Sequence, residues 1–144
     1  MPARDKYHQN FKNALTTDGW TITHDPLRLK WGNKDIYIDL GAEQLLTAEK
    51  AGCEIAIEIK SFSGASEIND LENAVGQYFL YRSVLARTEK GRTLYIAIHD
   101  EVFTEIFEEP VGRMIIEDYQ IPLIVFDPQT EVILRWIPNK PIAD

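Results

Sequence analysis

The chain has little cysteine and little positive charge, and it lacks long apolar runs. Cys53 is the only cysteine in 144 residues, which excludes an internal disulfide and a cysteine-rich zinc site, so we expect it to be an ordinary packing residue. With 15 basic against 23 acidic residues the net charge is −8, which argues against a general nucleic-acid coat protein. A metal-dependent nuclease is still compatible with this charge, because the ligands of its metal are themselves acidic.

No apolar stretch approaches the length of a membrane span, and the polar start has no apolar core of a secretory signal. The hydrophobic content of 44% is enough for a buried core, so we expect one cytoplasmic domain over residues 1–144, with no membrane association. A Gly-x-Ser-x-Gly elbow, a P-loop and a dinucleotide fingerprint are all missing. Serine hydrolysis, nucleotide hydrolysis and hydride transfer therefore have no support.

Hydrophobic periodicity predicts strands and helices in succession, which indicates an α/β or α+β sheet domain with helices on its faces. The predicted elements are a first helix ending at Asp18-Gly19, strands at 20–24, 27–31, 35–40 and 53–60, a long helix at 67–88, a strand at 94–98, a helical segment at 101–120 interrupted at Pro110, and strands at 123–126 and 131–137. The predicted buried stripe of the long helix comprises Ile68, Leu71, Val75, Tyr78, Phe79 and Leu85.

Residues 41–52 fit two interpretations. The stretch from Gln44 to Lys50 could form a short helix, or it could extend the preceding strand into a hairpin that turns at Ala51-Gly52. We favour the hairpin because it makes the strands that carry Asp39 and Glu58 antiparallel neighbours without a crossover.

Polar residues near the ends of these two strands predict a metal site. The strand ending at Lys60 has isoleucines at alternate positions, so Glu58 and Lys60 project together from its other face. The strand at 35–40 alternates in the same way. We expect Ile38 and Leu40 to face the core and Asp39 to face outward. If the strands pair, two carboxylates and one ammonium group converge.

Mg²⁺ takes oxygen ligands, often one or two carboxylates with waters and phosphate oxygens. Asp39 and Glu58 are therefore candidate ligands for Mg²⁺ or Mn²⁺. Lys60 is a candidate catalytic residue that polarises the attacking water or neutralises charge on the phosphate. A surface salt bridge between Glu58 and Lys60 is the simpler alternative.

Gln77 and Tyr81 lie four residues apart and share one face of the long helix, where an amide and a phenol can bind a phosphate or the catalytic lysine. Tyr81 has the alternative of being a core residue.

His8 lies on the first helix as a candidate metal ligand, or as a solvated or capping residue. Glu43 is a weaker candidate metal ligand, because it lies on the same face as Asp39 if that strand continues. His24 and His99 stand at strand ends, and we expect both to be structural.

Asp39, the Glu58-x-Lys60 pair and the order of strands and helices resemble the PD-(D/E)xK nuclease superfamily, and Gln77-x-x-x-Tyr81 resembles an element of its RecB-like branch. Ile38 stands where that superfamily has proline. The resemblance implies a restriction-endonuclease-like fold, with a central mixed β-sheet flanked by helices, and Mg²⁺-dependent cleavage of DNA. The RecB-like branch also implies a metal-ligand role for His8.

Nearly the whole chain is similar to the XisH family, the excision controlling factors of the cyanobacterial fdxN element. The similarity is carried by Arg4-Asp5 and by residues 18–26, 37–43, 57–62 and 124–128. It implies a role in DNA-element excision during heterocyst differentiation, beside a site-specific recombinase and a small companion protein, XisI. It does not imply that this chain cuts DNA.

Two functions stay open: a divalent-metal-dependent DNA endonuclease or phosphodiesterase, and a non-catalytic partner module that binds XisI or the recombinase. The acidic balance favours dependence on a partner for DNA affinity. The sequence does not determine the oligomeric state, and a homo-oligomer is one of the states that it allows. The small basic clusters expected to meet DNA are Arg28, Lys30, Lys34, Arg82 and Arg87.

Overall fold

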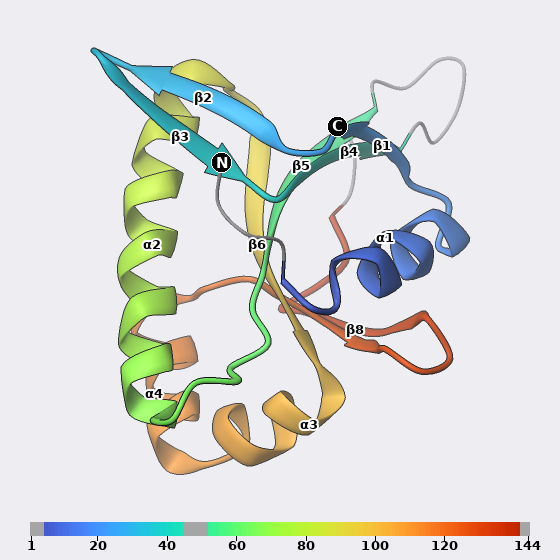
Figure 1. Cartoon of the computed structure of the whole chain (residues 1–144), viewed down its shortest axis with the longest axis vertical. Helices are drawn as coiled ribbons and strands as arrows, with labels where there is room; N and C mark the ends of the chain where they lie inside the picture. The colour runs from blue at the N-terminus through green and yellow to red at the C-terminus, as the bar shows by residue number, and fades with distance from the viewer. Residues whose placement is uncertain (1–4, 45–51, 142–144) are drawn as a thin grey trace.

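One mixed sheet lies between helices on both of its faces (Figure 1). The computed structural model describes residues 5–44 and 52–141. Within these residues the six strands of the sheet are β1 (Thr21–His24), β4 (Leu40–Gln44), β5 (Cys53–Ile59), β6 (Arg92–His99), β7 (Leu123–Asp127) and β8 (Val132–Ile137), in the spatial order β1-β4-β5-β6-β7-β8. The pairs β5–β6 and β6–β7 are parallel and the other neighbours antiparallel. The mixed α/β architecture with flanking helices was predicted and is confirmed.

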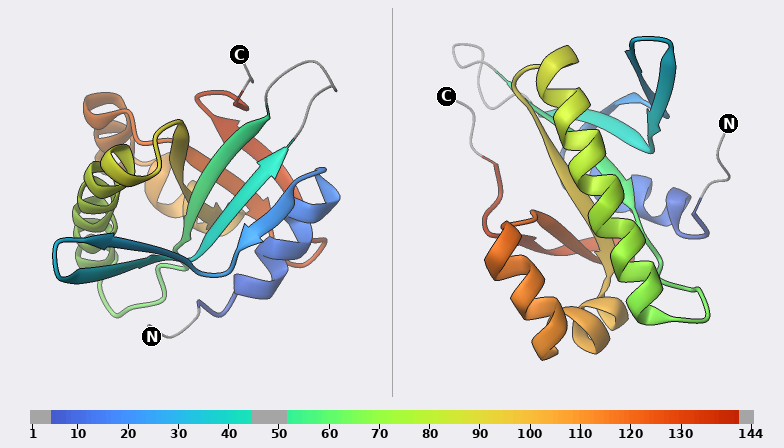
Figure 2. Two further views of the ribbon diagram at one scale, coloured as in Figure 1. Left: turned by 90° about the horizontal axis from the view of Figure 1, so that it is seen from above. Right: turned by 90° about the vertical axis from the view of Figure 1, so that its left-hand side faces the viewer.

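The helices divide between the two faces of the sheet, as the view from above shows (Figure 2). α1 (His8–Thr17) covers one face and α2 (Glu67–Thr88) the other. α3 (Asp100–Val102), the π-helix η1 (Phe103–Phe107) and α4 (Pro110–Tyr119) follow β6, and apolar residues of this segment join the core beneath α2. The predicted interruption at Pro110 is confirmed, because α4 begins there.

Alternation along the central strands produces two hydrophobic cores. On β5, Ile55 and Ile57 pack with Phe11 beneath α1, whereas Ala56 packs with Leu71 beneath α2. This confirms the predicted faces of β5. Because both faces are covered, Glu58 near the end of β5 is largely buried, with 9% of its surface exposed.

The strand predicted over residues 35–40 is wrong at Asp39, where the chain bends between β3 (Lys34–Ile38) and β4. β3 leaves the main sheet and pairs with β2 (Leu27–Trp31) in a separate antiparallel hairpin. As a result Ile38 packs beneath α2, while Leu40 packs in the other core. The alternation pattern misses the bend because Ile38 and Leu40 are both fully buried on either side of it.

The predicted antiparallel pairing of the strands before and after residues 45–51 is confirmed, with Leu40 opposite Ile57. Residues 45–51 themselves, and so most of the proposed turn or short helix, lie outside the described residues.

α2 begins at the predicted residue, because the side chain of Ser66 caps it by accepting the N–H of Asn69. The buried stripe was wrong for Ile68, which is 52% exposed in the first turn. In the part of the chain that the structure describes, no helix has both the length and the apolarity to cross a bilayer.

Candidate active site

Asp39 and Glu58 meet at the bend between β3 and β4. β4 and β5 are antiparallel, with Leu40 opposite Ile57. Asp39, which precedes Leu40, therefore lies next to Glu58, which follows Ile57. The backbone N–H of Asp39 donates to Glu58 Oε1 at 3.0 Å, and the backbone N–H of Ile59 donates to Asp39 Oδ2 at 2.8 Å. Each carboxyl group thus accepts a backbone N–H from the other segment, and these two hydrogen bonds take the place of strand-to-strand backbone bonds at the bend.

Lys60 lies directly after β5 and joins this pair to α2. Its backbone N–H donates to the carbonyl of Ala97 at 3.0 Å, which holds the residue beside β6. Its Nζ lies 3.5 Å from Glu58 Oε2 and donates to Gln77 Oε1. The amide of Gln77 therefore orients the ammonium group that neighbours the carboxylates.

The two carboxyl groups ionise with difficulty in this environment. The pKa of Glu58 is raised to about 8, first by burial and then by the charge of Asp39, while Lys60 opposes the shift. Burial also raises the pKa of Asp39, against the hydrogen bond from Ile59 and the charge of Lys60. Glu58 therefore ionises less readily near pH 7 in the metal-free protein than an exposed glutamate does.

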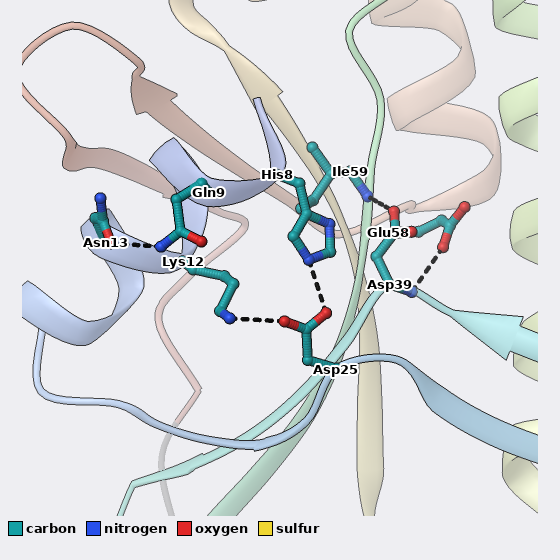
Figure 3. Close-up of polar contacts among 8 residues, drawn as sticks. All are labelled: His8, Gln9, Lys12, Asn13, Asp25, Asp39, Glu58 and Ile59. Atoms are coloured by element: carbon teal, nitrogen blue, oxygen red, sulfur yellow. Dashed lines mark hydrogen bonds and ion pairs between the residues drawn. The ribbon is translucent and has the colours of Figure 1, made fainter. Parts of the chain in front are cut away.

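His8 is the first residue of α1 and lies on the other side of the Asp39–Glu58 pair (Figure 3). Its side chain is buried, with 5% of the residue surface exposed. Its Nε2 lies 2.8 Å from Asp25 Oδ1, and Lys12 Nζ lies 2.6 Å from Asp25 Oδ2. The other ring nitrogen, Nδ1, is buried without a hydrogen-bond partner in the described structure. Figure 3 shows Nδ1 on the side of the ring that faces Asp39 and Glu58.

The contact with Asp25 favours the tautomer of His8 that carries its proton on Nε2, which leaves a lone pair on Nδ1. The interpretation of His8 as a solvated or capping residue is wrong, because the side chain is buried and Tyr7 occupies the cap of α1.

A polar cleft of about 360 Å³ opens beside the carboxyl pair. Its lining comprises Asp5, Tyr37, Asp39, residues 58–64, Asp70, Asn73, Gln77 and Tyr81. The loop after Lys60 is tied to α2 by Asp70 Oδ2, which accepts the N–H of Gly64 at 2.9 Å. Burial and the charges of Glu58 and Asp39 raise the pKa of Tyr81, so its hydroxyl keeps its proton and can donate to a phosphate.

These residues fit a hard divalent cation with an incomplete protein ligand set. Among the described residues, no three His, Cys, Asp or Glu side chains are already arranged as a metal site. Two carboxyl groups of raised pKa beside a buried, unpartnered imidazole nitrogen are nevertheless what a cation would stabilise. Mg²⁺ or Mn²⁺ held by Asp39 and Glu58 would keep waters and substrate oxygens as its other ligands.

The structure brings all six predicted site residues to this region: His8, Asp39, Glu58, Lys60, Gln77 and Tyr81. Glu43 lies elsewhere, near the far end of β4 opposite Glu54. His24 is exposed and contacts Thr23, while His99 is buried against the ring of Tyr7.

The sequence analysis missed Asp25, Lys12 and Tyr37. Asp25 lies 17 residues from His8, at a spacing typical of no local motif. Cys53 packs against the core beneath α1, as expected.

The fold and the site define a mixed α/β protein in which a buried carboxyl pair, a lysine and a histidine gather at a bend between two strands. The family described as XisH protein matches residues 1–134, and the chain belongs to the XisH family.

Two solved structures are similar over almost the whole chain. One is an XisH family protein from Nostoc punctiforme PCC 73102, with a TM-score of 0.83 and 34% identity over 92% of this chain and 98% of that one. The other is a fdxN element excision controlling factor protein from Anabaena variabilis, with a TM-score of 0.82 and 36% identity over 93% of this chain and 99% of that one. No curated protein matched the chain.

Proposed function

We propose that this protein is a divalent-metal-dependent phosphodiesterase that cuts DNA, with a PD-(D/E)xK site on a restriction-endonuclease-like fold. One observation carries the proposal: Asp39, Glu58 and Lys60 converge from neighbouring strands at one polar cleft. The buried, unpartnered Nδ1 of His8 beside them supports it. A lone surface salt bridge between Glu58 and Lys60 would need neither the burial nor the cleft.

Each side chain has a definite role in this proposal. Asp39 and Glu58 hold Mg²⁺ or Mn²⁺, with His8 as a further ligand, and the bound ion supplies Lewis acidity and lowers the pKa of water. Lys60 Nζ neutralises charge that develops on the phosphate, oriented by Gln77. Tyr81, on the same wall of the cleft as Gln77, donates a hydrogen bond to a phosphate oxygen.

The family suggests the process in which this chemistry acts. The Anabaena variabilis relative is named as an excision controlling factor of the fdxN element, and 36% identity supports a related role in DNA-element excision for this chain. We propose that an XisI-like companion or a site-specific recombinase supplies DNA affinity, because 23 acidic against 15 basic residues provide little net attraction to phosphates.

The test is cleavage of a panel of DNA structures with Mg²⁺ or Mn²⁺, with and without the companion protein. We expect cleavage that chelation of the metal stops and that Glu58→Gln removes. The same panel with the companion should show higher DNA affinity at near-physiological salt. Metal binding without cleavage under every condition would leave the non-catalytic partner module as the function.

A further inference from the structure

The β2–β3 hairpin is a basic element on an acidic protein. Residues 27–38 contain three basic residues, Arg28, Lys30 and Lys34, and one acidic residue, Asp35, so the hairpin carries a net charge of +2 while the chain carries −8. The hairpin leaves the main sheet and extends across α2 (Figure 1). Its positive charge is therefore concentrated on a projecting part of the molecule.

Pairing within the hairpin separates an apolar face from a polar face, because residues directly opposite each other share a face. On the polar face Arg28 lies opposite Tyr37, and Lys30 lies opposite Asp35. Tyr37 also lines the cleft of the candidate active site. The polar face thus begins at the cleft and runs outward along the hairpin. The apolar face packs beneath α2 through Leu27, Leu29, Ile36 and Ile38.

The tip of the hairpin presents an open indole ring. Trp31 is 51% exposed, lies opposite Lys34, and has the guanidinium of Arg87 5.9 Å from its ring centroid. Lys30 and Lys34 form no ion pair with any residue in the described ranges, whereas Arg28 pairs with Asp35 at 3.0 Å. By this register Trp31 and Lys34 continue the face of Leu29 beyond its buried part, whereas Lys30 lies on the polar face. The tip therefore carries an exposed aromatic ring with one unpaired cation on each face.

We propose that the β2–β3 hairpin binds a single strand of nucleic acid that leaves the cleft along the polar face, with Lys30 on a phosphate. The strand then crosses the tip, where Lys34 holds a further phosphate and Trp31 stacks on an unpaired base. The inference rests on the proposed function, because it specifies which DNA the site receives. Base stacking on an aromatic ring needs an open base face, which a closed duplex hides.

The dimensions agree with a short strand of nucleic acid. Three residue steps separate the Arg28–Tyr37 pair at the cleft from the Trp31–Lys34 pair at the tip, which is about 10 Å along a strand. At the rise of about 3.4 Å in a stacked DNA strand this length accommodates roughly three nucleotides, and it accommodates fewer when the strand is extended. An acidic polypeptide would match the charge of the hairpin but would leave the indole without a stacking partner.

Tryptophan fluorescence tests the proposal directly. Trp20 is 2% exposed and packs 5.6 Å from Trp136, so Trp31 is the tryptophan best placed for contact with a base. We expect a single-stranded oligonucleotide to quench the emission of the metal-free protein at low salt, and Trp31→Phe to lose that quenching. Trp31→Ala should weaken binding by about fivefold or more.

Charge variants test the phosphate contacts. Lys30→Glu and Lys34→Glu, made singly, should each weaken binding several-fold and reduce the slope of log affinity against log salt by about one. Arg113→Glu is the matched control: it makes the same charge change on exposed α4, at the opposite end of the molecule from the hairpin (Figure 1).

Equal quenching in Trp31→Phe, or equal losses of affinity in Lys30→Glu and Arg113→Glu, would overturn the proposal. So would stronger binding of blunt duplex than of single strand, or binding of polyglutamate in place of DNA. These measurements use no metal and no cleavage, so their failure is distinct from a failure of metal binding, which would overturn the proposed function.

Discussion

The backbone N–H of Asp39 donates to the side chain of Glu58 at 3.0 Å across 19 residues of sequence, and Asp39 accepts the N–H of Ile59 in return. Both candidate ligands therefore also close the bend between β3 and β4. Replacement by alanine would remove a ligand and a hydrogen-bond acceptor together. The amides Asn and Gln keep the acceptor oxygen and remove only the charge, so they separate the two roles.

Metal binding is expected to need both carboxylates. Calorimetric titration with Mn²⁺ should show a site in the wild-type protein that Asp39→Asn and Glu58→Gln each abolish, since two carboxylates are the core of the ligand set. Glu43→Gln is the matched control, because Glu43 lies near the far end of β4. Unchanged affinity in Glu58→Gln would contradict the assignment.

The stability of the metal-free protein is expected to fall as pH rises. The pKa of Glu58 is raised from 4.5 to about 8, so its stabilising contribution is complete below about pH 4.5 and is lost as pH rises to about 8. In the presence of a chelator Glu58→Gln should match the wild type near pH 4.5. Near pH 8 it should be more stable by about 1 kcal/mol or more, which is about 2–4 °C in Tm.

The same variant supplies the control for this prediction. Mn²⁺ should raise the Tm of the wild type near pH 8 and leave that of Glu58→Gln unchanged, because the ion binds only the native wild-type site. Equal Tm values of the two metal-free proteins across the whole pH range would show that burial of Glu58 carries no ionisation penalty.

Lys60 is expected to act on turnover alone. Lys60→Ala should lower cleavage by about 10²–10³-fold, since an ammonium group beside the phosphate acts in the transition state, and it should leave Mn²⁺ affinity intact. Gln77→Ala should give a smaller loss, because the amide only orients Lys60. Lys90→Ala, at an exposed lysine after α2, is the control. A fully active Lys60→Ala would make the lysine a simple ion-pair partner.

His8 and Asp25 are expected to contribute to metal affinity as a unit. Asp25→Asn should weaken Mn²⁺ binding by about 10- to 100-fold, because the carboxylate fixes the ring tautomer that presents Nδ1 to the ion. His8→Ala should weaken it at least as much, with circular dichroism as the check on folding. His24→Ala, at an exposed histidine, is the control. Unaltered affinity in both variants would place His8 outside the metal site.

Much of this arrangement could be predicted from local patterns. Alternation along β5 correctly separated Ile55 and Ile57 from Glu58, and the predicted start of the long helix at residue 67 agrees with the cap that Ser66 forms in the structure. Such features depend on neighbours within a few residues, so the sequence carries them directly. The prediction that Ile68 is buried was wrong, because helical periodicity assigns a residue to a face of the helix without showing how far the facing sheet extends.

The convergence of the site has a different origin. Asp39, Glu58 and His8 lie on separate elements, and only the pairing of β4 with β5 and the packing of α1 on the sheet bring them together. The bend at Asp39 follows from β3 pairing with β2, which alternation along one strand does not reveal.

The sequence by itself determined the mixed order of strands and helices and the polar residues at their ends, because backbone periodicity and capping are short-range effects. Only the tertiary structure decided that Glu58 is buried beside Asp39 with a pKa of about 8, and that His8 faces them with Asp25 behind it. Burial and charge proximity are properties of packing between distant segments, so residue types and spacing do not contain them.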